Sequence, residues 1–478
     1  MQRPGIADVK TVGEFVKQIE AVLNKGDVLT GEDVTNRTAG VWRQDTIQAR
    51  AIVRPTSTNE VAEVMARCHE HGQSVVLHGG LTGLVHAADS GPADLVISME
   101  RMNVIEDIDT LGRTMTVQAG VLLQQIHEAA AAQGLMFPVD LGARGSCQIG
   151  GNVATNAGGL RVIRYGMTRE NVLGLEAVLA DGTVVSSLNV MIKNNSGYDL
   201  KQLFIGSEGT LGVVTRLVLR LRTSLAAQHT AMVAFPDYGA VMKFLSYLDG
   251  ALSGNLSAYE VMWPDYFLYT RDKIGGPAMQ MDPDRPFYAI VESLGADQER
   301  EAETFENALT RAHEDGLLVD AIVAKSASEG AAIWRIRDEV EHLFEVGDIV
   351  FFDVSLAVRP MANYVELVRQ RMNACAFDAD FFVFGHLGDG NLHFGVAVGD
   401  ETEKYRHEIE SAIYEPLASL GGSVSAEHGI GLEKKSWLSV SRSASEIALM
   451  RRLKQAMDPK GILNPGKIFD YDGPQVLI

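Results

Sequence analysis

A glycine-rich segment at 384–394, FGHLGDGNLHF, carries two of the side chains best suited to metal binding and proton transfer. His386 and His393 stand seven residues apart, but the glycines around them disfavour a helix. Asp389-Gly390 is a dipeptide typical of tight hairpins, so the pattern predicts a strand, a turn and a second strand. Such a hairpin would bring the two histidines back toward each other.

A second segment at 425–431, SAEHGIG, adds an acid and a further histidine. Two neutral imidazoles and a carboxylate suit zinc or another divalent transition metal, so His386, His393 and Glu427 are predicted metal ligands. His428 is then available as a general base for the proton that a metal-bound hydroxyl group or water releases. This chemistry would serve hydrolysis or alcohol oxidation. The alternative is an ordinary Asp-Gly hairpin with surface histidines.

Bulk composition narrows the class of protein. A chain of 478 residues predicts two or three domains, and 46% hydrophobic with 22% charged residues is ordinary for a globular protein. The net charge of −20 argues against nucleic acid or an anionic membrane as partner. No stretch approaches the roughly 18 apolar residues of a membrane span, so no integral membrane segment is expected. Three widely spaced cysteines favour a reducing, cytoplasmic setting.

The first half of the chain reads as alternating helices and strands. Ser57 and Glu60 form a capping-box pattern before an apolar stripe, which predicts a helix that ends at Gly72 and is followed by a strand. Further strands are expected at 94–99, 114–120 and 209–221, a hairpin at 175–185 and a helix at about 122–133. The glycine-rich 140–159 segment is interpreted as a long irregular loop, and such loops are usually functional.

The second half begins after a change to small and polar residues at 222–230, which we interpret as a domain boundary. Helices are expected at about 237–250, 298–315, 329–345, 361–376, 402–419 and 443–457, with strands near 287–293, 318–325, 350–357 and 381–385. This alternation predicts an α+β layer.

Two glycine loops in the first half offer backbone N–H groups without side chains. HGGLTGL at 78–84 follows a predicted strand, and the second loop holds two glycine pairs around asparagines within 140–159. Either loop alone could be a plain turn, but two in one domain favour a large nucleotide cofactor whose diphosphate they would bind. No G-x-G-x-x-G follows a strand, so a nicotinamide site of the Rossmann type is unsupported.

Two further polar residues are candidates for substrate binding. Arg337 would by default be a solvated helix charge, but beside Trp334 it could grip a carboxylate with both ends of its guanidinium, and Arg335 competes for that role. Asn391 is either a turn residue or a hydrogen-bond donor to substrate.

The motifs GGLTGL, IGGNVATNAGG, GSEGTLGVVT, GHLGDGNLH, SAEHGIG and DPKGILNPGKI stand in one particular order. From about residue 45 to 470 the chain resembles the FAD-linked 2-hydroxyacid dehydrogenases of the vanillyl-alcohol-oxidase type. The resemblance implies an α+β fold with a PCMH-type FAD-binding domain of two α+β subdomains at 1–222. It also implies a substrate and metal domain with an antiparallel sheet at 223–454, and a tail at 455–478 near the flavin.

The resemblance also implies cofactors and roles. FAD is expected without a covalent link, because His78 precedes its paired glycines rather than following them. His386, His393 and Glu427 match zinc or manganese ligands, and His428, Arg337 and Asn391 match catalytic positions. The expected FAD contacts are His78, Gly79, Gly80, Leu81, Thr82, Gly83, Leu84, Pro138, Gly145, Ser146, Gly150, Gly151, Asn152, Asn156, Gly158, Gly159, Arg164, Gly166, Glu208, Gly209, Val213 and Asn464.

The implied reaction is oxidation of a small D-2-hydroxy acid to the 2-oxo acid by hydride transfer to flavin N5. Electron-transfer flavoprotein or a quinone is the implied acceptor, and a homodimer is the expected assembly. Glu341 and Phe351 stand where the hydroxyglutarate enzymes carry a threonine and a lysine for the distal carboxylate, and Gly395 replaces an asparagine. These departures favour lactate or an apolar tail, with D-2-hydroxyglutarate as the alternative if Lys325 or another basic residue supplies the missing charge.

Two other classes remain open from the residues alone. A metal-dependent hydrolase without flavin would use the same three ligands and His428, but it leaves both glycine loops unexplained. A non-catalytic scaffold would bind no metal, and His428→Ala would then change no activity.

Overall fold

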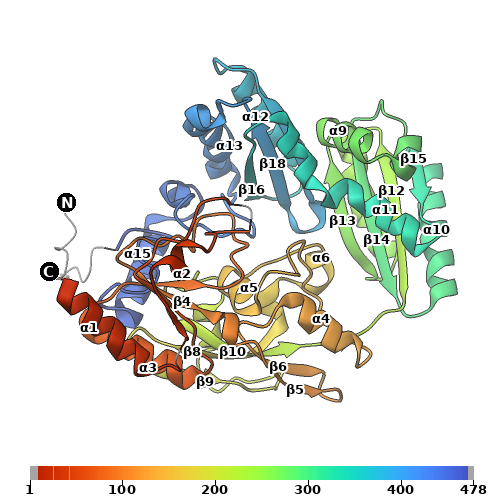
Figure 1. The fold of residues 1–478 in the computed structure, drawn as a ribbon. Helices are drawn as coiled ribbons and strands as arrows, with labels where there is room; N and C mark the ends of the chain where they lie inside the picture. The colour runs from red at the N-terminus through yellow and green to blue at the C-terminus, as the bar shows by residue number, and fades with distance from the viewer. Residues whose placement is uncertain (1–8, 25, 42, 472–478) are drawn as a thin grey trace.

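The computed structural model describes residues 9–24, 26–41 and 43–471. Its first part contains a mixed four-stranded sheet in the order β1-β2-β4-β3, in which β4 is parallel to both neighbours and β1 is antiparallel to β2. The strands are β1 (Val28–Leu29), β2 (Ala51–Val53), β3 (Val75–His78) and β4 (Leu95–Ser98). Figure 1 shows this sheet beside the amino-terminal helices.

A five-stranded antiparallel sheet completes the first part, in the order β5-β6-β10-β8-β9. Its strands are β5 (Ile105–Asp109), β6 (Thr114–Gln118), β8 (Val172–Val178), β9 (Val184–Ser187) and β10 (Val213–Arg220), while β7 (Leu135–Met136) pairs with β11 (Arg222–Thr223). The predicted hairpin around Asp181-Gly182 is confirmed, since Val178 pairs with Val184. The helices of this part are α1 (Val9–Glu20), α2 (Glu32–Thr35), α3 (Thr58–His71), α4 (Leu123–Ala131), α5 (Ile149–Thr155), α6 (Val162–Tyr165) and α7 (Lys201–Phe204).

The predicted capped helix is α3. The Ser57 side chain accepts the Glu60 N–H at 3.3 Å, and Gly72 ends the helix in the left-handed conformation at φ 63°. Its apolar stripe is buried against the two sheets and consists of Val61, Val64, Met65 and Cys68. Local capping and apolar spacing therefore define this element without tertiary information.

The second part is built on a seven-stranded antiparallel sheet in the order β15-β12-β14-β13-β17-β18-β16. Its strands are β12 (Ala227–Phe235), β13 (Leu256–Met262), β14 (Phe287–Gly295), β15 (Asp320–Val323), β16 (Val350–Ser355), β17 (Asp380–His386) and β18 (Asn391–Ala397). The antiparallel sheet implied by the resemblance is thus present, and the α+β fold class is confirmed.

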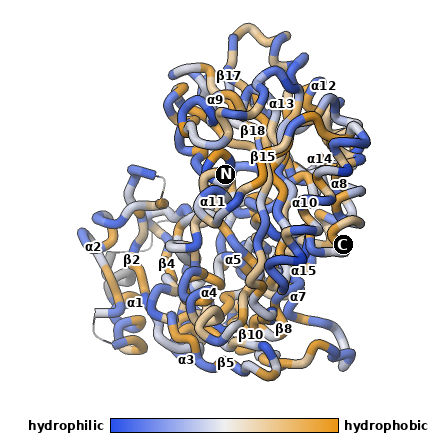
Figure 2. The backbone as a smooth tube through the Cα atoms, turned by 90° about the vertical axis from the view of Figure 1, so that its right-hand side faces the viewer, coloured by the Kyte–Doolittle hydropathy of each residue, from blue (hydrophilic) through white to orange (hydrophobic). Residues whose placement is uncertain are grey.

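Helices cover both faces of this sheet. One face packs on α8 (Tyr238–Ala251), α10 (Gln298–Glu314), α12 (Met361–Asn373) and α13 (Arg406–Leu420). The other packs on α9 (Pro264–Ile274) and α11 (Ala327–Asp338). Figure 1 shows α12 and α13 beside β16 and β18, and Figure 2 shows how hydrophobic and hydrophilic residues alternate along the outer helices. Each face therefore has its own apolar core.

Several predicted elements were wrong. The segment 140–159 is not wholly irregular, because Ile149–Thr155 forms α5, whose Gly150 packs closely on Ala119 and donates its N–H to the Ala119 carbonyl at 2.8 Å. The helix predicted at 329–345 ends at Asp338 and continues as a separate 3-10 segment, Val340–Val346. Strands β12 and β13 and helix α9 were not predicted.

The chain returns to the first part after α14 (Leu438–Ser441) and α15 (Ala444–Met457). Leu463 bridges Val75 of β3, and the Asn464 side chain accepts the Leu77 N–H at 2.9 Å while donating to the Glu208 carbonyl at 2.6 Å. Figure 1 shows α15 in dark blue beside the red and orange elements. Among the described residues, the helices are too short or too polar to cross a bilayer.

Candidate active site

Four adjacent strands each place one polar side chain on the same face of the seven-stranded sheet. Glu260 of β13 pairs in register with His386 of β17, and Asp353 of β16 pairs with His393 of β18. Alternate residues on a strand share a face, so these four side chains point away from the core under α12 and α13. The sheet thereby concentrates two acids and two histidines that are far apart in sequence.

The predicted hairpin is confirmed. Strands β17 and β18 are joined by the 3-10 turn Leu387–Asp389 and by Gly390 in the left-handed conformation at φ 85°. The ring centroids of His386 and His393 lie 5.2 Å apart. Asn391 begins β18 buried, and its side-chain oxygen has no hydrogen-bond partner in the described part of the chain.

The three predicted metal ligands lie together. Glu427 Oε1 is 3.8 Å from His386 Nε2 and 3.9 Å from His393 Nε2, and the candidate ligand atoms all lie within 4.8 Å of one another. Two imidazole nitrogens and one carboxylate oxygen at this spacing fit a divalent transition metal that keeps further coordination positions open. The donor set and its geometry are therefore compatible with the metal that the sequence predicts.

A buried acid orients the first histidine. Glu260 Oε1 lies 2.6 Å from His386 Nδ1, and because a carboxylate only accepts, Nδ1 carries the proton and Nε2 is left for the metal position. Burial alone would raise the pKa of Glu260, but His386 and Arg337 outweigh that effect and hold the pKa below its usual value. Sequence analysis missed Glu260, although an acid inside an apolar strand was a usable signal.

The structure distinguishes the two candidate arginines. Arg337 is 7% exposed, its Nε lies 3.0 Å from Glu260 Oε2, and its guanidinium stacks 4.6 Å from the Phe384 ring. Its Nη2 lies 3.4 Å from His386 Nε2. Arg335 instead faces solvent and pairs with Glu339. Arg337 is therefore the arginine that belongs to the site.

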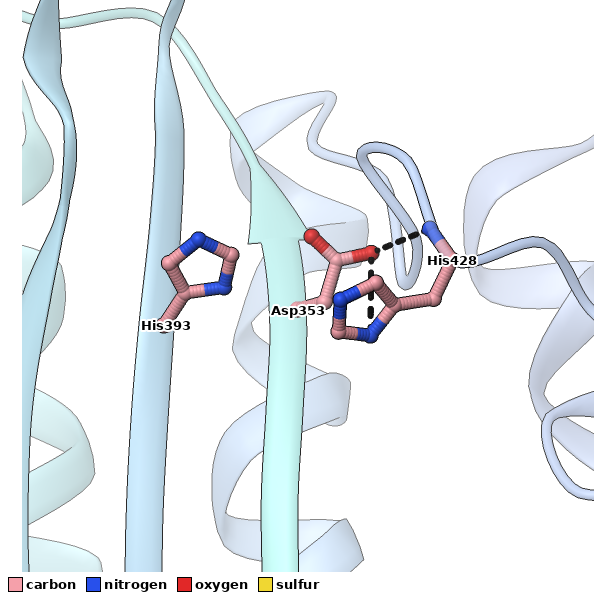
Figure 3. A group of neighbouring side chains, drawn as sticks. All are labelled: Asp353, His393 and His428. Carbon is pink, nitrogen blue, oxygen red and sulfur yellow. Dashed lines mark hydrogen bonds and ion pairs between the residues drawn. The ribbon is translucent and has the colours of Figure 1, made fainter. Parts of the chain in front are cut away.

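Asp353 of the seven-stranded sheet binds the backbone of the segment 425–431. Its Oδ2 accepts the N–H groups of Ala426, Glu427 and His428 at 3.0 Å each. Figure 3 shows Asp353 next to His428, with His393 on the neighbouring strand. Burial alone would raise the pKa of Asp353, but His428 and Lys434 outweigh it and hold the pKa well below the usual range. Sequence analysis missed this residue as well.

The first part of the chain holds the same segment from the opposite side. Glu208 accepts the N–H groups of Ile430 and Gly431 at 2.7 Å each, and burial raises the pKa of this carboxyl group. The Gly159 N–H donates to Glu427 Oε2 at 3.0 Å. The loop that carries Glu427 and His428 therefore lies at the interface between the two parts.

A cavity of about 380 Å³ runs between the glycine loops and ends at Glu427 and His428. The predicted cofactor residues that line it are His78, Gly79, Gly80, Leu81, Thr82, Gly83, Leu84, Gly150, Gly151, Asn152, Glu208, Gly209, Val213 and Asn464. Two buried side-chain oxygens in its wall, Gln148 Oε1 and Asn152 Oδ1, have no partner among the described residues. Bare backbone and unpaired polar atoms fit a polar nucleotide cofactor.

Other predicted cofactor residues do not line this cavity: Pro138, Gly145, Ser146, Asn156, Gly158, Gly159, Arg164 and Gly166. Arg164 instead reaches the second part, where it donates to the Leu294 carbonyl at 2.6 Å and to Asn255 Oδ1 at 3.1 Å. Asn156 ends α5 at φ 53°.

His78 and Gly80 show how the first glycine loop is fixed. His78 is buried, and its Nε2 lies 2.8 Å from the Ala88 carbonyl, to which it donates. Burial lowers the pKa of His78 to about 4, so the ring is neutral. A Cβ atom on Gly80 would come within 2.0 Å of the Ser146 carbonyl oxygen. Only glycine allows the two loops to approach this closely.

A cavity lined by both glycine loops and by Glu427 and His428 is typical of an enzyme that holds a nucleotide cofactor beside its reacting groups. The family described as FAD linked oxidases, C-terminal domain, matches residues 225–468, and the FAD binding domain matches residues 49–187. The chain therefore belongs to the FAD-linked oxidases.

Relatives of known name agree with this assignment. The chain is 38% identical to D-2-hydroxyglutarate dehydrogenase of Xanthomonas citri pv. viticola over 93% of each chain. It is 36% identical to the mitochondrial D-2-hydroxyglutarate dehydrogenase of Arabidopsis thaliana over 88% of this chain and 75% of that one.

Solved structures share the fold. One is p-cresol methylhydroxylase with bound substrate, at TM-score 0.77 and 15% identity over 98% of this chain and 99% of the other. Another is alkyldihydroxyacetonephosphate synthase, at TM-score 0.73 and 16% identity over 97% of this chain and 86% of the other. The expected α+β fold of the FAD oxidases is confirmed.

Proposed function

We propose that the protein oxidises a D-2-hydroxy acid to the corresponding 2-oxo acid with non-covalently bound FAD and a divalent metal. One observation carries the proposal: the cavity lined by both glycine loops is also lined by Glu427 and His428. The redox cofactor and the acid–histidine cluster thereby serve a single reaction space. A hydrolase would have no use for the glycine-lined end of this cavity.

The oxidation separates two hydrogens of the substrate. The hydrogen on C2 leaves with its bonding pair, the hydroxyl hydrogen leaves as a proton, and the C–O bond becomes C=O. When bound, FAD supplies the hydride acceptor at N5, and zinc or manganese supplies a Lewis acid for the hydroxyl oxygen.

The residues of the chain supply the remaining parts. His386, His393 and Glu427 hold the metal, and His428 accepts the hydroxyl proton. Glu260 engages Nε of Arg337 and His386 lies beside Nη2, so Nη1 is the amino group proposed to face the substrate carboxylate. Asn391, with its unpaired buried oxygen, is the proposed hydrogen-bonding residue for the substrate.

The surroundings of His393 favour a substrate with a short or apolar tail. Gly395 lies two residues along β18 on the same face, and it pairs in register with Phe351. A Cβ atom at Gly395 would lie 2.9 Å from Ile349 Cδ1 and 3.4 Å from Phe351 Cε1. Lys325, the alternative counter-charge, lies exposed and pairs with Glu306 at 2.9 Å. D-lactate or an apolar 2-hydroxy acid therefore fits better than a dicarboxylate.

D-2-hydroxyglutarate is the second candidate, because the two relatives described above are named for it. A panel of D- and L-2-hydroxy acids, tested for anaerobic bleaching of the flavin, tests the proposal. We expect bleaching by D-lactate or an apolar homologue, and in Phe351→Lys a shift of at least tenfold in kcat/KM toward D-2-hydroxyglutarate. Bleaching by no 2-hydroxy acid would refute the function. Preference of the unaltered protein for D-2-hydroxyglutarate would refute only the tail assignment.

The wider setting belongs to the same proposal. Electron-transfer flavoprotein or a quinone would receive the electrons, and the protein would work in the cytoplasm as a homodimer. Its acidic balance, with a net charge of −20, suits a small-molecule substrate rather than nucleic acid.

A further inference from the structure

The Asp353 carboxylate is buried within the site. Its side chain is fully buried, and Oδ2 accepts four hydrogen bonds: one from Ser425 Oγ at 3.1 Å and three from the N–H groups of Ala426, Glu427 and His428 at 3.0 Å. Three consecutive backbone N–H groups on one oxygen fix the path of the chain through these residues. The loop is therefore shaped around this carboxylate.

The same oxygen faces the imidazole. Asp353 Oδ2 lies 3.8 Å from His428 Nδ1, and Figure 3 shows the ring beside the carboxylate. His428 also lines the cofactor cavity. At 3.8 Å the two groups are in ion-pair contact without a hydrogen bond. A carboxylate beside one ring nitrogen can still orient a histidine whose other nitrogen takes up a proton.

Lys434 compensates the buried charge. Its Nζ lies 3.7 Å from Asp353 Oδ2 and donates to the Asp353 main-chain oxygen at 3.1 Å, and its side chain is only 4% exposed. A buried carboxylate with four donors and a cation beside it is stable as an anion. Asp353 is thus a stable buried anion, and the strand register places it opposite His393.

We propose that Asp353 is the positioning residue for His428: it holds the 425–428 backbone and turns the imidazole so that one nitrogen faces the cavity. This inference rests on the proposed function, in which His428 accepts the hydroxyl proton. Asp353 does not line the cavity, whereas His428 does, so we expect the effect of Asp353 on turnover to pass through His428.

Two substitutions separate the holding of the 425–428 backbone from the orientation of the His428 imidazole. Asp353→Asn keeps an oxygen that can accept the three N–H groups but removes the charge, whereas Asp353→Ala removes both. Hydrogen exchange of residues 425–431 needs no substrate. We expect these amides to exchange at least tenfold faster in the alanine variant and nearly as in the unaltered protein in the asparagine variant. Unchanged exchange in Asp353→Ala would refute the role in holding the loop.

Turnover tests the action through His428. In anaerobic single-turnover reduction we expect Asp353→Asn, with FAD and metal content unchanged, to slow the step at least about 100-fold, as removal of an orienting carboxylate does elsewhere. Added to His428→Asn, the same change should slow it less than threefold further, because groups that act through one another are not additive.

Three further results would overturn the catalytic part of the proposal. The first is a flavin-reduction rate of Asp353→Asn within threefold of that of the unaltered protein. The second is full additivity of the rate effects of Asp353→Asn and His428→Asn, and the third is loss of a second equivalent of metal in Asp353→Asn. The last would make Asp353 a ligand, since its carboxylate, His393 and His428 also lie within 4.8 Å of one another. If none of the tested 2-hydroxy acids reduces the flavin of the unaltered protein, the proposed function fails, and with it the catalytic part of this inference. The exchange rates still decide the structural part.

Discussion

Glu260→Gln should weaken metal binding without altering the metal ligands. Glu260 orients His386 through the 2.6 Å contact to Nδ1 and strengthens the imidazole as a donor. Loss of a carboxylate that hydrogen-bonds to a metal-ligating histidine typically lowers metal affinity about 10- to 100-fold, or by ~1.4–2.7 kcal/mol. The glutamine side-chain oxygen can still accept a hydrogen bond from Nδ1–H, so we expect a loss toward the lower end, about tenfold.

The assay is a titration of metal-depleted protein with Zn²⁺ against a coloured chelator. Arg337 also loses its charged partner, and breaking a buried pair costs about 3–5 kcal/mol of folding stability. The titration therefore belongs at a temperature at which circular dichroism shows both proteins folded.

Glu292→Gln is the matched control. Glu292 lies on the same face of neighbouring β14 and is 3% exposed, and its carboxylate accepts from Gln228 at 2.7 Å and Ser257 at 2.9 Å. We expect its metal affinity to stay within twofold of the unaltered protein. If Glu260→Gln binds Zn²⁺ as tightly as the unaltered protein, or if both variants weaken equally, the assignment of Glu260 to the metal site is wrong.

Two predictions concern the glycine loop. The folded-state pKa of His78, about 4, lies below the 6.5 of the unfolded chain, so its stabilising contribution is complete above pH 6.5 and is lost as the pH falls toward 4. At about 1.4 kcal/mol per pH unit, this lowers the free energy of unfolding by ~3 kcal/mol between pH 6.5 and 4. The free energy of unfolding of His78→Gln, measured with urea, should therefore depend less on pH over this range. An unchanged pH dependence would contradict the burial of a neutral His78. Gly80→Ala should destabilise the FAD-free protein by about 1–3 kcal/mol, whereas Gly83→Ala, which has open space around it, should not; equal urea midpoints would contradict the close approach.

Local sequence signals were sufficient for part of the site. The Asp389-Gly390 turn determines the hairpin that brings His386 and His393 together, and the structure confirms that Glu427 joins them. The capped helix α3 was predictable for the same reason, because its signals lie within one stretch of chain. The roles of these residues in metal binding remain a prediction.

The residues that were missed act through distant partners. Glu260 is 126 positions from His386, and Asp353 is 75 from His428, so only the strand order β13-β17-β18-β16 makes them neighbours. Helix α5 was missed because glycine is a poor helix former, and one of its two glycines, Gly150, is required by close packing on Ala119. Helix propensity could not anticipate a packing contact with a residue 31 positions away in sequence.

The side chain of Asn464 joins β3 to the Glu208 turn across 387 positions of sequence. Both the strand and the turn are synthesised long before this asparagine. The wall of the cofactor cavity therefore lacks one of its lining residues until the ribosome has added residue 464.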